Sequence, residues 1–95
     1  MKLNYKVIER VITEWNPMKI IIYIDGLIIN PDEYEPEIND IFDNCKYVKN
    51  GDINGLAKMI GNIFNKWFEI RLNAEECFKA AEVIYYESKC FTNSV

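Results

Sequence analysis

Histidine is absent from this 95-residue chain, and its absence removes several kinds of chemistry at once. Without an imidazole there is no Ser-His-Asp or Cys-His catalysis, no histidine metal ligand and no histidine pH switch. The four glycines, at 26, 51, 55 and 61, match neither the dinucleotide-binding pattern nor the P-loop pattern. We therefore expect no enzyme activity and no cofactor.

Long apolar runs are also absent. The longest, Ile20 to Ile24, has five residues and stops at Asp25, far short of the roughly 20 residues that span a membrane. The first ten residues carry charges and contain no small-residue cleavage site, which is unlike a signal peptide. These features predict a cytoplasmic protein with no membrane partner.

Cysteines are few and show no functional spacing. Cys45, Cys77 and Cys90 are odd in number, and no two of them form a C-x-x-C pair. In a reducing cytoplasm such residues are free thiols that behave as small apolar side chains. We predict that all three are structural and that none binds a metal.

Positive charge is missing from the middle of the chain. Residues 20–45 hold seven of the fifteen acidic residues and no Lys or Arg, so this stretch carries −7. The remainder has eight acids and eleven bases and carries +3, which gives the total of −4. A segment of this charge repels nucleic acid and attracts basic surfaces, so the predicted partner is a basic protein.

Four amphipathic helices are predicted from apolar residues that recur every three or four positions. They cover residues 2–15, a short stretch from Pro36 to about 45, residues 53–68 and residues 74–89, with Asp52 and Asn73 as caps of the last two. Trp15 and Trp67 each end an apolar stripe and are expected in the core. Gly61 costs about 1 kcal/mol in mid-helix, which a close approach of another helix would offset. The fold class is mainly α, a compact four-helix domain over residues 1–95.

Residues 18–30 admit more than one structure. Two β-branched runs flank Asp25-Gly26, a combination that favours a β-hairpin at about 20–29. Two strands alone are only marginally stable, so the hairpin would have to lie on the helices. The alternative is an apolar loop or a single helical turn packed on the core.

The acidic cluster around the second predicted helix has four interpretations. Catalytic carboxylates would need apolar surroundings that the sequence does not provide, and a calcium site would need an EF-hand spacing that is absent. Two further interpretations are compatible with each other: a solvated helix start that favours the helix dipole, and a contact surface for a basic protein. Tyr34 suits either an interface or the packing of its ring. The predicted partner-binding residues are Asp32, Glu33, Tyr34, Glu35, Glu37, Asp40 and Asp43.

Two sequence blocks resemble a known family. The segments VIERVITEWNPM and PDEYEPEINDI, followed by Leu56, Ala57, Ile60, Ile63 and Phe64, are similar to the YugE-like family of small bacterial proteins, classed as a domain of unknown function. The resemblance covers roughly residues 5–86. This chain has Asn16 where the family usually has Asp, and a longer stretch between Pro17 and Pro31.

The resemblance implies a compact helical domain with no established enzymatic activity. Similar small domains are found beside bacterial toxins as candidate immunity proteins, and many such toxins are basic nucleases. The charge distribution suits an immunity protein that binds and neutralises a toxin of this kind. The alternative is a small structural or self-associating housekeeping protein, a homodimer formed through the segment Ile20–Ile29.

Overall fold

The structure, a computed structural model, describes residues 1–17 and 34–93. The elements are α1 (Tyr5–Trp15), α2 (Glu35–Asn44), the 3₁₀ turn η2 (Cys45–Tyr47), α3 (Ile53–Phe68) and α4 (Ala74–Asn93). The described part of the chain has four α-helices and no strand, so the prediction of a mainly α four-helix domain is confirmed. The hairpin predicted at 20–29 lies outside the described residues.

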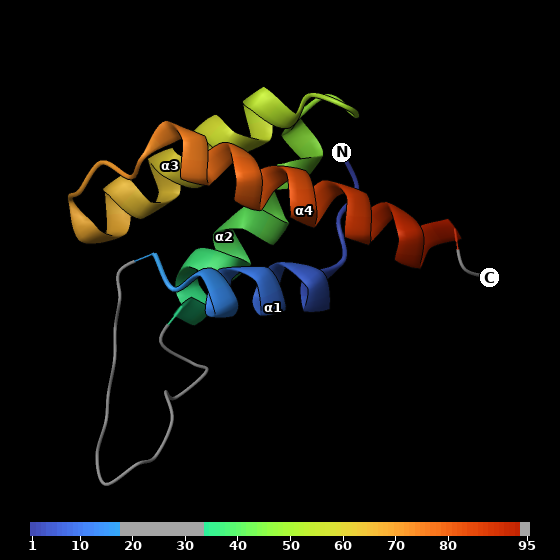
Figure 1. Ribbon diagram of the computed structural model, residues 1–95, viewed down its shortest axis with the longest axis horizontal. Helices are drawn as coiled ribbons and strands as arrows, with labels where there is room; N and C mark the ends of the chain where they lie inside the picture. Colours follow the sequence, from blue (N-terminus) through green and yellow to red (C-terminus); the bar gives the residue numbers. More distant parts are fainter. Residues whose placement is uncertain (18–33, 94–95) are drawn as a thin grey trace, which may run out of the picture.

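The helices pack in a closed ring. α1 contacts α2 and α4, while α3 contacts the same two helices, and the α3–α4 interface is the largest. In Figure 1, α3 and α4 run side by side, α1 lies below them, and α2 crosses between α1 and α3. This arrangement leaves one side of α2 without a neighbouring helix.

Capping side chains define the residues at which the helices begin. The Asn4 side chain accepts a hydrogen bond from the backbone N–H of Val7 at 3.2 Å, so α1 begins at residue 5 and not at the predicted residue 2. The caps predicted for α3 and α4 are confirmed, because Asp52 and Asn73 accept from backbone N–H groups at 2.9 and 3.1 Å. α4 continues beyond the predicted residue 89 to Asn93, since no Gly or Pro interrupts it.

Aliphatic side chains from all four helices form the core. The most deeply buried are Ile8, Ile12, Ile38, Ile41, Leu56, Ile60 and Ile84. An aromatic cluster closes one end of this core: the Phe64 ring lies 5.8 Å from the ring of Tyr34, 5.9 Å from that of Phe68 and 6.1 Å from that of Trp15. Trp15 is thus packed against the core, as predicted.

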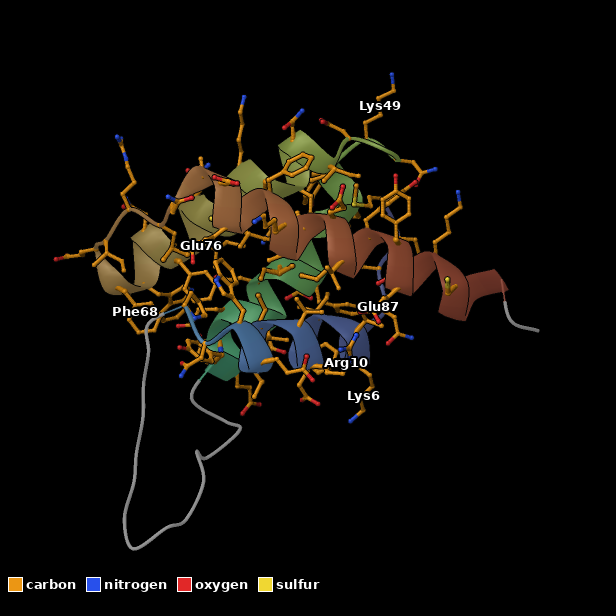
Figure 2. All side chains as sticks on the ribbon, in the orientation of Figure 1. Lys6, Arg10, Lys49, Phe68, Glu76 and Glu87 are labelled. Carbon is orange, nitrogen blue, oxygen red and sulfur yellow. The ribbon has the colours of Figure 1, made fainter. Side chains whose placement is uncertain are left out.

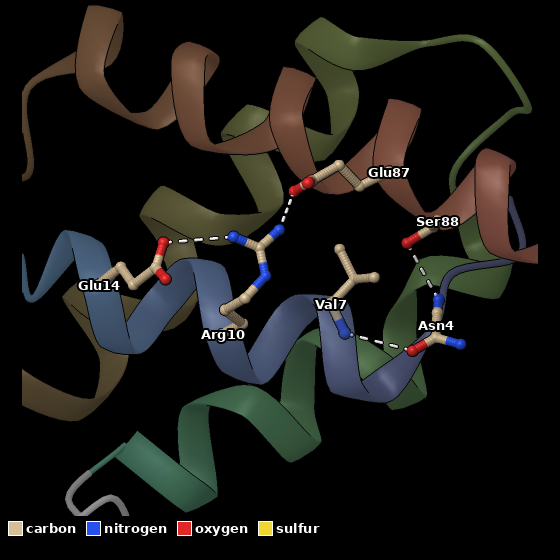
Figure 3. Close-up of polar contacts among 6 residues, drawn as sticks. All are labelled: Asn4, Val7, Arg10, Glu14, Glu87 and Ser88. Carbon is tan, nitrogen blue, oxygen red and sulfur yellow. Dashed lines mark hydrogen bonds and ion pairs between the residues drawn. The ribbon is translucent and has the colours of Figure 1, made fainter.

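Two polar contacts join the N-terminal segment and α1 to one turn of α4 (Figure 3). Arg10 forms ion pairs with Glu14 of its own helix and with Glu87 of α4. Near the start of α1, the backbone N–H of Asn4 donates to the hydroxyl of Ser88 at 3.0 Å. Ser88 is fully buried, so this bond satisfies a polar group inside the interface.

Gly61 is not required by the packing of α3 on α4. A Cβ atom at this position would meet only the Cys77 Sγ, at 3.7 Å, which is an ordinary van der Waals distance. The sequence led us to expect a close approach of another helix at Gly61; Cys77 of α4 does lie within contact distance of this position, although a methyl group would also fit. The glycine leaves an open space at the surface of α3.

Candidate functional site

The outward side of α2 gathers acidic side chains on one face. Glu35, Asn39 and Asp43 follow one another at intervals of four residues, and Asp40 lies at the edge of the same face, because successive residues turn by roughly 100°. Glu35 and Asp43 are exposed, and Asp40 is half-buried. Pro36 stands in the first turn of α2, where its missing N–H needs no partner.

Two of the predicted partner-binding residues are buried. Tyr34 and Glu37 are only 2% and 3% exposed, so they offer almost no surface to a partner. The Tyr34 ring packs against α3, and its hydroxyl donates a hydrogen bond to the side chain of Asn16. Packing is therefore the role that the structure gives this tyrosine. Asp32 and Glu33 lie outside the described residues.

Aromatic side chains border the acidic face on both sides. From α1, the Tyr5 hydroxyl donates to Asn39 Oδ1 at 2.9 Å, and its ring meets the ring of Phe42 edge-on at 5.4 Å. From α3, the Trp67 indole N–H donates to Asp40 Oδ2 at 2.8 Å. Both contacts fix the orientation of a polar side chain of α2.

Trp67 is a correction to the sequence prediction, which placed it in the core. Its side chain is 46% exposed, because it lies at the surface between α3 and α2. The indole N–H needs a hydrogen-bond partner, which an aliphatic core does not supply and Asp40 does. We define the α2 surface by its seven residues: Tyr5, Glu35, Asn39, Asp40, Phe42, Asp43 and Trp67.

A hollow of about 500 Å³ adjoins this surface between α2, η2 and α3. Its apolar lining comes from Val48, Met59 and Ile63, while Asp40 stands on its rim. Tyr47, also on the rim, is 78% exposed. The hollow has room for an aliphatic or aromatic side chain of a partner.

The charges of the α2 surface are only weakly compensated. The Lys66 ammonium lies 3.8 Å from Asp40 Oδ2, and an exposed pair of this kind contributes little net stability. Burial, and then the charges of Glu9 and Glu35, raise the pKa of the Tyr5 hydroxyl. The phenol therefore stays neutral and continues to donate to Asn39 at moderately alkaline pH.

The remaining reactive groups are dispersed. Cys45 and Cys77 are buried as predicted, whereas Cys90 is exposed. Burial, followed by the charge of Glu76, raises the pKa of the Cys77 thiol. Among residues 1–17 and 34–93, no three His, Cys, Asp or Glu side chains are grouped so as to hold a metal ion. No helix in this part of the chain has the length and apolar character to cross a bilayer.

Sequence reasoning missed two features of this surface. The exposure of Trp67 carried no signal, because this residue ends an apolar stripe. The burial of Glu37 did have a signal, because on a helical wheel this residue falls next to Ile41, at the edge of the apolar side.

Comparison with known proteins identifies the family of the chain. No curated protein and no solved structure matches it. One family model does, and its description is a domain of unknown function, DUF1871. The match runs from residue 6 to residue 91 and so covers nearly all of the four helices. The protein therefore belongs to the DUF1871 family.

Proposed function

We propose that the protein is a non-catalytic binding domain and that the α2 surface is its docking face for a basic protein. The contact of Trp67 with Asp40 carries this proposal. It holds a half-exposed indole beside an acidic face, and tryptophan is enriched among the residues that dominate binding energies. Because the hydrogen bond already orients the ring, less conformational entropy is lost on binding.

Charge supports the same assignment. Glu35 and Asp43 are exposed on one side of α2, in the stretch of sequence that has no Lys or Arg. Carboxylates in such a position accelerate the encounter with a basic surface, whereas the apolar hollow and Trp67 would slow dissociation. The two effects are separable in a kinetic measurement.

In its most specific form, the proposal describes an immunity protein that masks a basic toxin, most concretely a nuclease. This form depends on the resemblance to the YugE-like family and on the charge of the α2 surface. Neutralisation would follow from covering the toxin's basic active-site cleft, so it requires no catalytic residue in this chain.

The test begins with capture of partners from the source cell lysate by the tagged protein. A stoichiometric basic partner is then purified, and its association and dissociation rates are measured at low and physiological salt. We expect Glu35→Lys with Asp43→Lys to slow association at least about tenfold at low salt, and less at high salt. Trp67→Ala should mainly accelerate dissociation.

A matched control reverses two exposed acids elsewhere, Glu75→Lys with Glu82→Lys on α4. This pair has the same effect on net charge and should alter association much less. If both pairs slow association equally, only net charge matters and the α2 surface is not the docking face. A homodimer without a partner, lost on Ile22→Lys, would replace this proposal with the self-associating alternative.

A further inference from the structure

A second concave site lies between α3 and the start of α4, and its chemistry is opposite to that of the α2 surface. This groove encloses about 440 Å³. Its polar lining consists of two cations, Lys58 and Arg71, and three asparagines, Asn54, Asn62 and Asn65. No Asp or Glu lines it.

The residues on the polar face of α3 have a low helix propensity. Asn54, Lys58, Asn62 and Asn65 recur at intervals of three or four, so they form one row along the groove. Asparagine is a poor helix former, roughly half a kcal/mol or more worse than alanine. Within the described part of the chain, no protein group is hydrogen-bonded to these three side-chain amides. Their donors and acceptors are available to a ligand in the groove.

The start of α4 borders the groove. Ala74, the first residue of α4, lines the groove, and the free N–H groups and dipole of a helix start attract anions. This first turn also holds two acids, Glu75 and Glu76, and the charge of Glu76 acts on Cys77, which lines the groove. The positive potential of the groove therefore comes from Lys58 and Arg71.

The floor of the groove is apolar. It is formed by Ala57, Gly61 and Cys77, with Leu72 and Phe78 beside them. The packing of α3 on α4 does not require a glycine at position 61. The absence of a side chain there leaves the floor of the groove open. A pocket with an apolar floor and a few convergent polar groups is typical of a small-molecule site.

We propose that this groove binds a small organic phosphate, with the phosphate between Arg71 and Lys58 and an apolar body over Gly61. Arginine suits phosphate oxygens, and the row of asparagines supplies hydrogen bonds to polar atoms of the body. This site is distinct from the α2 surface, and it does not depend on the proposed function.

The test is a titration of ¹⁵N-labelled protein with phenyl phosphate, followed by amide chemical shifts. We expect shifts at the asparagine side chains of α3 and at the backbone of the first turn of α4. Arg71→Gln should weaken binding about tenfold, since a charge-assisted hydrogen bond is lost. Gly61→Leu, which fills the floor without changing charge, should weaken it by a similar factor.

The matched control is Lys49→Gln, which removes a cation that points away from the body of the protein (Figure 2). It should leave the affinity for phenyl phosphate within about twofold. Equal losses in Lys49→Gln and Arg71→Gln, or no shifts in the groove, would overturn the proposal. Two other ligands test the parts of the site. If phenol bound as tightly as phenyl phosphate, the phosphate group would have no role in binding. If inorganic phosphate bound as tightly as phenyl phosphate, the apolar floor would have none.

Discussion

Replacement of Gly61 by alanine should make the protein more stable. Glycine in the interior of a helix costs about 1 kcal/mol relative to alanine, mainly because it loses more backbone freedom on folding. The new methyl group would meet only Cys77 Sγ, at 3.7 Å, so no steric cost offsets this gain. For a domain of this size, about 1 kcal/mol corresponds to a rise in melting temperature of roughly 4–8 °C.

The measurement is urea denaturation followed by circular dichroism at 222 nm, with thermal melting beside it. The free energy of unfolding should rise by about 1 kcal/mol with an unchanged slope, so the midpoint moves to higher urea. No change, or a loss of stability, would show that α4 lies closer to Gly61 than the structure places it.

Gly55→Ala in the same helix is the control, because it makes the same chemical change in a different environment. A Cβ at Gly55 would lie 2.3 Å from the carboxylate of Asp52, which caps α3 through the Gly55 N–H. The displaced cap costs about 1 kcal/mol and cancels the gain in helix propensity. If both substitutions stabilised the protein equally, the different surroundings of Gly61 and Gly55 could not explain the effect.

Three further outcomes are expected. Ser88→Ala should destabilise the fold by about 1–3 kcal/mol in urea denaturation, because the partly buried N–H of Asn4 loses its acceptor; an unchanged midpoint would contradict this. In the native protein at pH 8, a thiol reagent such as dithionitrobenzoate should modify Cys90 rapidly and the two buried cysteines only after unfolding; rapid modification of all three would disprove the burial. The raised pKa values of Cys77 and Tyr5 mean that the unfolded chain deprotonates first, so stability should fall as the pH rises above about 9. The fall should be smaller in Cys77→Ala with Tyr5→Phe, and an equal fall would exclude these two groups as its cause.

The helices were predictable because their signals are local. The spacing of apolar residues predicted four helices. Asp52 and Asn73 predicted the starts of two of them, because a capping side chain accepts a hydrogen bond from a backbone N–H only two or three residues away. The start of α1 was missed by three residues, because Leu3 continues the apolar pattern although it precedes the helix and is buried by tertiary packing.

The candidate sites were less predictable, since they depend on which faces meet. Whether Trp67 is buried or exposed is decided by the position of α2, which the sequence of α3 does not specify. The burial of Tyr34 depends on Phe64 and Phe68, thirty or more residues away along the chain. The groove at Gly61 needed both the polar row of α3 and the position of Arg71 beside it, and only the first is visible in the sequence.

The hydrogen bond between Tyr34 and Asn16 has a consequence for the ends of α1 and α2. It ties together two residues that are 18 positions apart and stand at the ends of α1 and α2. Together with the packing of the Tyr34 ring on Phe64, this bond fixes where the chain leaves α1 and where it enters α2. The positions of these two ends are therefore set by the four-helix body and not by the number of residues between Pro17 and Tyr34.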